Sequence, residues 1–137
     1  MNTKSTPAVI PLRYVASVDD VRKYYIDALA FDHMMGMVGK DGQLDFAIVV
    51  RAGAMLMLSR PQTPDGATSG ALEIYVEVDD VDAYHAEVAG RGVAIANAPE
   101  TQWWGDRNFS VVDPAGHKIW FWKTVGEVQP PPGVTLI

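Results

Sequence analysis

Two acidic side chains, Glu73 and Glu77, occur within an apolar, strand-like stretch of this chain. Residues 71–78 alternate in a way that is typical of a β-strand, so Glu73 and Tyr75 should lie on the face opposite to Ile74 and Val76. A carboxylate enclosed by apolar side chains needs a hydrogen-bonding partner or takes up a proton more easily. Glu73 is therefore a candidate catalytic residue, acting as a general base, or a polar anchor for a ligand.

Large, adaptable side chains are predicted to share that face. Alternation places Trp120 and Trp122 on one side of residues 117–122, and Met55 and Met57 occupy the matching side of an earlier strand. Indole rings and thioethers suit planar or irregular ligands. The alternative is that these side chains fill the space and leave no site. The predicted ligand-binding residues are Arg13, Met55, Met57, Glu73, Tyr75, Trp104, Trp120 and Trp122.

The elements that position these residues are predicted from an internal repeat. Val-Asp-Asp-Val occurs at 18–21 and again at 78–81, a shift of 60 that also relates Tyr24 to Tyr84. Further along, a shift of 63 relates Phe46 to Phe109. A fixed internal period indicates one structural unit used twice. The functional site is then expected where the two copies face each other.

Each copy reads as a β-α-β-β-β module. A Val/Ile/Tyr-rich strand runs into Asp-Asp, which can cap a helix, and an amphipathic helix and turn-separated strands follow. Asp113-Pro114-Ala115-Gly116 is a strong turn signal. The predicted organisation is an N-terminal tail at 1–7, a first module at 8–60, a linker at 61–70, a second module at 71–124 and a Pro-rich tail at 125–137, with both modules in one domain.

Arg13 is predicted to belong to the site because of the internal repeat. The shift of 60 relates it to Glu73, so the two should pair across the pseudo-twofold axis, either as an anchor for a ligand or as a salt bridge that merely joins the halves. The register of the first strand stays open, because the end of the first helix would instead place Ile10 at this position.

Composition narrows the classes of function. A net charge of −6 argues against nucleic acid as a partner, because binding it requires a basic face. The absence of cysteine excludes disulfides and thiolate metal sites. The chain shows no signal peptide and no stretch of about 20 apolar residues that could span a membrane. A cytoplasmic protein without a membrane partner is expected.

The most specific motif of the chain lies in its second half. Trp104-Gly105-Asp106-Arg107 through Asp113-Pro114-Ala115-Gly116-His117 resembles the signature of a PhnB-like subgroup of the vicinal oxygen chelate superfamily, which includes glyoxalase I, extradiol dioxygenases and bleomycin-resistance proteins. The helix ending Tyr24–Leu29 is similar to the family motif, with Ala30 in place of the usual Gly. The resemblance covers about residues 8–124. It implies an α+β fold in which two βαβββ modules form a cup-shaped mixed sheet with helices on the outer face.

The resemblance also marks four inward-facing positions that hold a metal in the metal-dependent members. Here they correspond to Arg13 (or Ile10), Met57, Glu73 and Trp120. A single carboxylate does not supply the three or more ligands that a transition metal requires. No metal site and no cofactor are predicted.

The three histidines do not suggest a metal triad either. His85 and His117 are interpreted as structural residues, and His33 is placed in a methionine-containing loop that could line a cup mouth or a dimer contact. Arg107 is interpreted as a tie between a loop and a strand, with Asp106 as a possible partner.

The sequence therefore favours a metal-free protein that binds a small aromatic or amphipathic molecule, such as an antibiotic, in a cup between its modules. The alternative is an enzyme of this fold, a lyase or isomerase that uses Glu73 as acid or base, or a dioxygenase-like enzyme with an unrecognised metal site. A third reading is a structural or regulatory dimer. The resemblance implies a homodimer, to which the apolar C-terminus could contribute.

Overall fold

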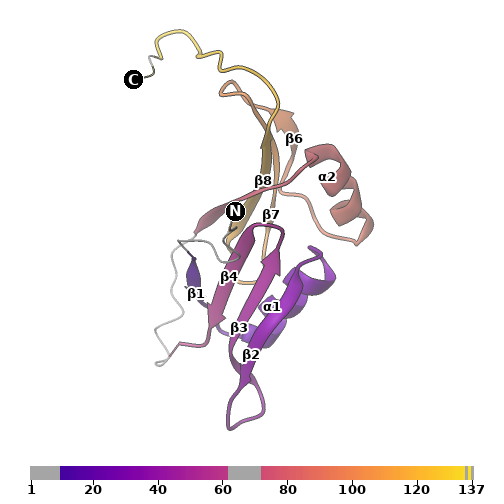
Figure 1. The fold of residues 1–137 in the computed structure, drawn as a ribbon, viewed down its shortest axis with the longest axis vertical. Helices are drawn as coiled ribbons and strands as arrows, with labels where there is room; N and C mark the ends of the chain where they lie inside the picture. The colour runs from indigo at the N-terminus through magenta and orange to yellow at the C-terminus, as the bar shows by residue number, and fades with distance from the viewer. Residues whose placement is uncertain (1–9, 62–71, 135, 137) are drawn as a thin grey trace, which may run out of the picture. The chain divides into compact units, whose positions relative to one another are not determined.

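A computed structural model of the chain describes residues 10–61, 72–134 and 136. It contains two compact units, one made of Met1–Leu72 with Asp113–His117 (unit 1) and the other of Glu73–Val112 with Lys118–Ile137 (unit 2). Each contains one helix and a four-stranded sheet, so the predicted α+β class and the tandem βαβββ organisation are confirmed (Figure 1). None of the described helices is long and apolar enough to cross a membrane.

Unit 1 is a mixed sheet with its helix on one face. The strand order is β1-β4-β3-β2, with β1 parallel to β4 and the other pairs antiparallel. The helix packs on β2, β3 and β4 (Figure 1). The elements are β1 Leu12–Tyr14, α1 Val18–Asp27, β2 Asp32–Val38, β3 Leu44–Arg51 and β4 Ala54–Ser59.

Unit 2 repeats this arrangement. The strand order is β5-β8-β7-β6, with β5 parallel to β8, and α2 packs on β6, β7 and β8. The elements are β5 Glu73–Glu77, α2 Val81–Gly90, β6 Asn97–Thr101, β7 Asp106–Val112 and β8 Lys118–Thr124.

The helix starts show that the repeat has a period of 63 there, not 60. Ser17 caps α1 by accepting the amide of Asp20 at 3.1 Å, and Asp80 caps α2 by accepting the amide of Ala83 at 3.0 Å. The two Val-Asp-Asp-Val segments are therefore not equivalent. The first lies inside α1, whereas the second runs through the cap into α2, so the predicted shift of 60 is wrong.

The sheets bury one face each, as the alternation predicted. In β5, Ile74 and Val76 are buried while Glu73 and Tyr75 are exposed. In β8, Ile119 and Phe121 are fully buried under α2, whereas Trp120 and Trp122 are half-buried on the other face. We call the face of each sheet turned away from its own helix the open face.

The core of unit 1 contains a buried ion pair. Arg13 Nη2 donates to Asp113 Oδ2 at 2.5 Å and to the hydroxyl of Tyr25 at 2.7 Å, and that hydroxyl donates to the same carboxylate oxygen at 2.9 Å. Both charged side chains are at most 2% exposed. The other oxygen of Asp113 accepts the amides of Ala115 and His117, each at 2.9 Å. The predicted Asp-Pro-x-Gly turn is thus tied to α1 and β1.

Arg13 therefore does not pair with Glu73, and that prediction is wrong. Arg13 lies opposite the buried Leu58 in the register of β1 and β4, so it faces α1, while Leu12 and Tyr14 face the other way. Leu12 is opposite Met57, just as Tyr75 is opposite Trp120. The period of 63 then relates Glu73 to Ile10, the second of the two registers left open by the sequence.

The C-terminal segment of unit 2 is held at residues 125–129 by backbone hydrogen bonds to the turn between β6 and β7. Its described part forms no strand. The amides of Val125 and Gly126 donate to the carbonyl of Gly105 at 2.9 and 3.1 Å, and the amide of Gln129 donates to the carbonyl of Trp103 at 2.7 Å. Gly105 has a φ of +97°, and a Cβ there would lie 2.5 Å from the carbonyl oxygen of Gly126. The turn between β6 and β7 therefore needs glycine for both its conformation and its close backbone approach.

Replacing Asp113 with Asn should destabilise the protein by about 3–5 kcal/mol, because a buried guanidinium loses its counter-charge. Tyr25→Phe is the matched control. It removes one hydroxyl from the same cluster and should cost only about 1 kcal/mol. Chemical denaturation with circular dichroism measures both values. Equal losses for the two variants would show that the charge of Asp113 stabilises the cluster no more than the Tyr25 hydroxyl does.

Gly105→Ala should destabilise by at least about 2 kcal/mol, since it adds a backbone clash to the strain of a positive φ. Gly92→Ala separates the two effects, because Gly92 has a φ of +85° but a Cβ at this position would meet no atom within 4 Å. Its cost should be about 1 kcal/mol. Thermal unfolding of both variants tests this, and a Gly105 variant no worse than the Gly92 variant would contradict the close packing of residues 125–129.

Candidate functional site

The open face of unit 2 brings together three of the predicted site residues. Trp120 Nε1 donates to Glu73 Oε1 at 2.6 Å. The rings of Tyr75 and Trp120 are stacked, with centroids 6.1 Å apart and planes 13° apart. This follows from the parallel pairing of β5 and β8, which sets Tyr75 directly beside Trp120. The face thus carries a carboxylate whose orientation is fixed by an indole N–H.

Two further residues complete this surface. Trp122 lies beside Glu77 in the register, is half-buried and has no ring partner among the described residues. Lys118 Nζ lies 5.3 Å from the ring centroid of Trp120, a cation–π contact. The described part of unit 2 therefore offers aromatic rings, the carboxylates of Glu73 and Glu77 and the ammonium of Lys118 on a single sheet face.

The sequence analysis missed a polar cluster on the same face. Asn108 and Ser110 in β7 lie opposite Trp122 and Trp120 and are almost completely buried. Ser110 Oγ donates to Asn97 Oδ1 at 2.6 Å, and Gln102 Nε2 donates to Asn108 Oδ1 at 3.2 Å. The signal was present, because Asn108 and Ser110 alternate with Phe109 and Val111 in the same way as the tryptophans alternate with Ile119 and Phe121.

The open face of unit 1 is mostly apolar. Met57 lies between Leu12 and Ile48 in the sheet register and is half-buried, whereas Met55 is only 8% exposed. Tyr14 and Met37 contribute exposed side chains. Met55 therefore offers little surface to a ligand in this structure, and the other apolar side chains provide most of the accessible area.

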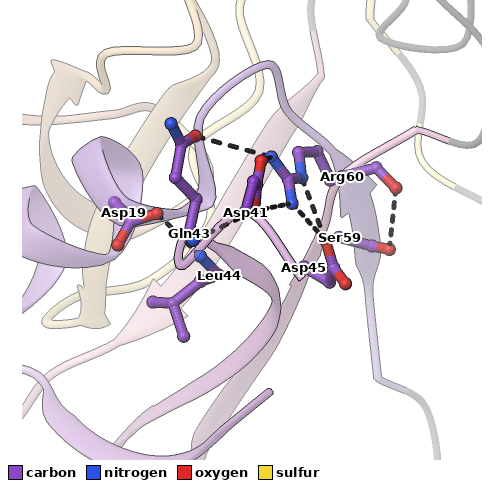
Figure 2. Close-up of polar contacts among 7 residues, drawn as sticks. All are labelled: Asp19, Asp41, Gln43, Leu44, Asp45, Ser59 and Arg60. Atoms are coloured by element: carbon purple, nitrogen blue, oxygen red, sulfur yellow. Dashed lines mark hydrogen bonds and ion pairs between the residues drawn. The ribbon is translucent and has the colours of Figure 1, made fainter. Parts of the chain in front are cut away.

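A hollow of about 360 Å³ lies at one end of unit 1, lined by Met37, Asp45, Phe46, Ser59, Arg60 and Pro61. Arg60 donates to Asp41 at 2.7 and 3.0 Å, to Asp45 and to Gln43, which ties the turn between β2 and β3 to the end of β4 (Figure 2). The hydrogen bonds from Arg60 lower the pKa of Asp41 to about 2. The hollow is therefore bordered by a charge cluster in which one arginine is shared by two aspartates.

Trp104 lies outside β5 and β8. It is in the turn between β6 and β7, 39% exposed, with its ring edge-on to that of Trp103 at 5.4 Å. No described contact connects it with Glu73 or Trp120. Arg107, in the adjoining strand, bonds through two nitrogens to Asp82 of α2 at 2.8 and 2.9 Å. It therefore ties a strand to a helix, and its partner is not the predicted Asp106.

The fold and motif can now be compared with known proteins. Residues 10–121 match the model of the Glyoxalase/Bleomycin resistance protein/Dioxygenase superfamily. The chain belongs to this superfamily. Ala30 adopts a φ of +61°, a conformation that favours the glycine usual at this position, so this chain keeps the backbone turn after α1 with a strained residue.

Several solved structures have a similar fold. TioX from Micromonospora sp. ML1 is similar with a TM-score of 0.72 and 19% identity, over 87% of this chain and 99% of that one. TnmS3, an antibiotic binding protein from Streptomyces sp. CB03234, is similar with a TM-score of 0.63 and 26% identity, over 91% and 99%. Among curated proteins, Mb0911c of Mycobacterium bovis, itself uncharacterized, is 29% identical over 90% of this chain and 87% of its own length.

The superfamily's metal positions can be read again with the corrected register, as Ile10, Met57, Glu73 and Trp120. Glu73 is the single oxygen donor in this set, so the donor set does not suit a divalent metal. Among the described residues, no three His, Asp or Glu side chains gather as metal ligands would.

The histidines have structural partners. His117 is 7% exposed, and its Nδ1 accepts the amide of Leu72 at 3.0 Å. His33 is in β2, not in the predicted loop, and accepts a hydrogen bond from Arg22 at 3.1 Å. The ring of His85 is edge-on to Phe109 at 5.2 Å. The structural interpretation of His85 and His117 agrees with these contacts.

Acidification should destabilise unit 1 through His117. Burial, followed by the charge of Arg13, lowers the pKa of this imidazole below its ordinary value. The unfolded chain therefore takes up the proton first, so stability that is fully present above about pH 6.5 is lost progressively as the pH falls from that value through the lowered pKa of the folded protein. Denaturation midpoints between pH 8 and pH 5 should fall less steeply for His117→Asn, whose amide oxygen can still accept from Leu72. Parallel curves for both proteins would contradict this assignment.

Proposed function

We propose that this protein binds a small planar aromatic or amphipathic molecule without a metal, and that the open face of unit 2 is its principal contact surface. The observation that carries the proposal is the group formed by Glu73, Tyr75, Trp120 and Trp122, which presents rings and an oriented carboxylate on a sheet face that α2 does not cover. Concave, mostly apolar sites with a few placed polar groups are typical of small-molecule binding.

The apolar open face of unit 1 supports the same proposal. Leu12, Tyr14, Met37 and Met57 offer surface that water solvates poorly, and methionine adapts to ligands of irregular shape. The antibiotic-binding description of TnmS3 suggests the ligand class, so an antibiotic with a planar ring system is our proposed ligand. Enclosure of the ligand in a cup between the modules and a homodimeric assembly stay predictions.

Intrinsic tryptophan fluorescence provides the test. A panel of planar aromatic compounds should include members that quench the fluorescence saturably. Trp122→Ala should weaken their binding about tenfold, because a stacking surface is lost together with its buried area. Trp103→Ala is the matched control, since Trp103 lies in the turn between β6 and β7 and its ring contacts that of Trp104. Quenching that is absent throughout the panel, or that is equally weakened by both variants, would count against the proposal.

The same titration with added chelator tests the metal-free part. Affinity should be unchanged by chelator and by added zinc, nickel, manganese or iron(II), because the donor set around Glu73 holds one oxygen ligand. Metal analysis of the purified protein accompanies the titration. Binding that requires one of these ions would refute a metal-free site and favour the dioxygenase-like alternative.

A second candidate function rests on Glu73 itself. Its carboxylate is exposed on the open face and oriented by the Trp120 N–H, which suits a general base in a lyase or isomerase. Glu73→Gln distinguishes the two functions. A variant that retains ligand affinity but no longer converts the ligand would favour the enzyme, whereas a ligand that is recovered unchanged from wild-type protein favours the binder.

A further inference from the structure

We infer that the ligand of unit 2 presents a hydrogen-bond donor or a cationic nitrogen, carried on a planar ring, to the carboxylate of Glu73, and that Trp120 positions this carboxylate. The inference rests on the proposed function and names the chemical class that the same surface selects.

The hydrogen-bonding capacity that remains on Glu73 determines the chemical class of the ligand. An ionised carboxylate is an acceptor only, with room for about four donors on its two oxygens. One described donor reaches it, Trp120 Nε1 at 2.6 Å, and the side chain is exposed. A ligand group that meets this carboxylate must therefore donate, and a cationic donor makes the stronger, charge-assisted bond.

The charges on the face point to a cation. Glu77 already has a partner, because Lys123 Nζ lies 3.3 Å from it. Lys118 is the cross-strand neighbour of Glu73 but makes no ion pair within 4.0 Å with any described carboxylate, and its ammonium lies over the Trp120 ring instead. Among the described residues, Glu73 thus has no cation in contact.

Lys118 takes the place that a cation bound over the Trp120 indole would take. A cation that is held by both an aromatic face and a carboxylate is favoured by the ring quadrupole and by the opposite charge. A cationic ligand would therefore compete with Lys118, whereas an anionic ligand would use Lys118 as its anchor. Removing the charge of Lys118 should therefore strengthen the binding of a cationic ligand and weaken the binding of an anionic one.

Trp120 acts through Glu73 more than through stacking. Its N–H is bonded to the carboxylate, and its ring already contacts Tyr75 and Lys118. Trp122 has no ring partner among the described residues, and Tyr75 is 59% exposed. Trp122 and Tyr75 are therefore the rings on which a ligand stacks, and Trp120 is a positioning residue.

Three acridines of equal ring size test the inference with the full-length chain: 9-aminoacridine, acridine and acridine-9-carboxylate. Isothermal titration calorimetry at one fixed ionic strength should show 9-aminoacridine binding about tenfold more tightly than acridine, with the carboxylate weakest. Glu73→Gln should abolish the preference for 9-aminoacridine and leave the affinity for acridine nearly unchanged.

Two further variants test the roles of Lys118 and Trp120 and distinguish them from a general loss of structure. Lys118→Gln should strengthen 9-aminoacridine binding about two- to fivefold, because the competing ammonium is gone. Trp120→Phe keeps a ring but removes the N–H, and it should weaken 9-aminoacridine about two- to fivefold without affecting acridine. Circular dichroism and thermal unfolding confirm that each variant is folded.

The outcomes that overturn the inference differ from those that overturn the function. Tighter binding of the carboxylate, weakening by Lys118→Gln, or a preference that survives Glu73→Gln would refute a donor-bearing ligand while binding itself stands. A Trp120→Phe variant that weakens all three acridines equally would refute the positioning role. Binding of none of the three to wild-type protein would refute the inference together with the proposed function.

Discussion

The buried ion pair between Arg13 and Asp113 is the constraint on which the architecture of unit 1 depends. A guanidinium and a carboxylate removed from water are stable only when the geometry is good and most of their hydrogen bonds are made. Asp113 meets this demand with four donors, from Arg13, Tyr25 and two amides of its own turn. Arg13 meets it less completely, because its Nε and Nη1 have no described partner. The burial of the Arg13 guanidinium therefore depends heavily on the carboxylate of Asp113.

The orientation of Arg13 also decides which side chains of β1 reach the open face. A strand of three residues has little register preference of its own, and a slip by one residue would exchange its faces. With Arg13 turned toward α1, Leu12 and Tyr14 must point the other way. The chemistry of the open face in unit 1 is thus a consequence of a polar contact on the opposite face of the sheet.

Sequence alone predicted the repeat unit, the helices and the faces of β4, β5 and β8, because two-residue and 3.6-residue periods are local properties. The pairing of Arg13 with Glu73 was predicted wrongly because the two copies were aligned on their identical tetrapeptides. The correct alignment superposes the residues that cap the two helices. Ser17 and Asp80 both accept an amide at a helix start, but the first tetrapeptide follows its cap while the second contains it. The Asn108 and Ser110 cluster was missed because polar residues at buried positions look like loop residues until their partners are known.

The two open faces differ in how firmly their side chains are held, and this difference bears on selectivity. In unit 2, the Trp120–Glu73 bond, the Tyr75 stack and the Ser110–Asn97 bond fix polar groups in defined directions. In unit 1, the exposed side chains of the open face include Leu12, Tyr14 and Met37, which make no hydrogen bonds through their side chains to other described residues. Fixed polar groups reject ligands that leave them unpaired, whereas thioethers accommodate many shapes. Under the proposed function, the fixed polar groups of unit 2 should discriminate between ligands, whereas the apolar face of unit 1, taken by itself, should tolerate varied shapes.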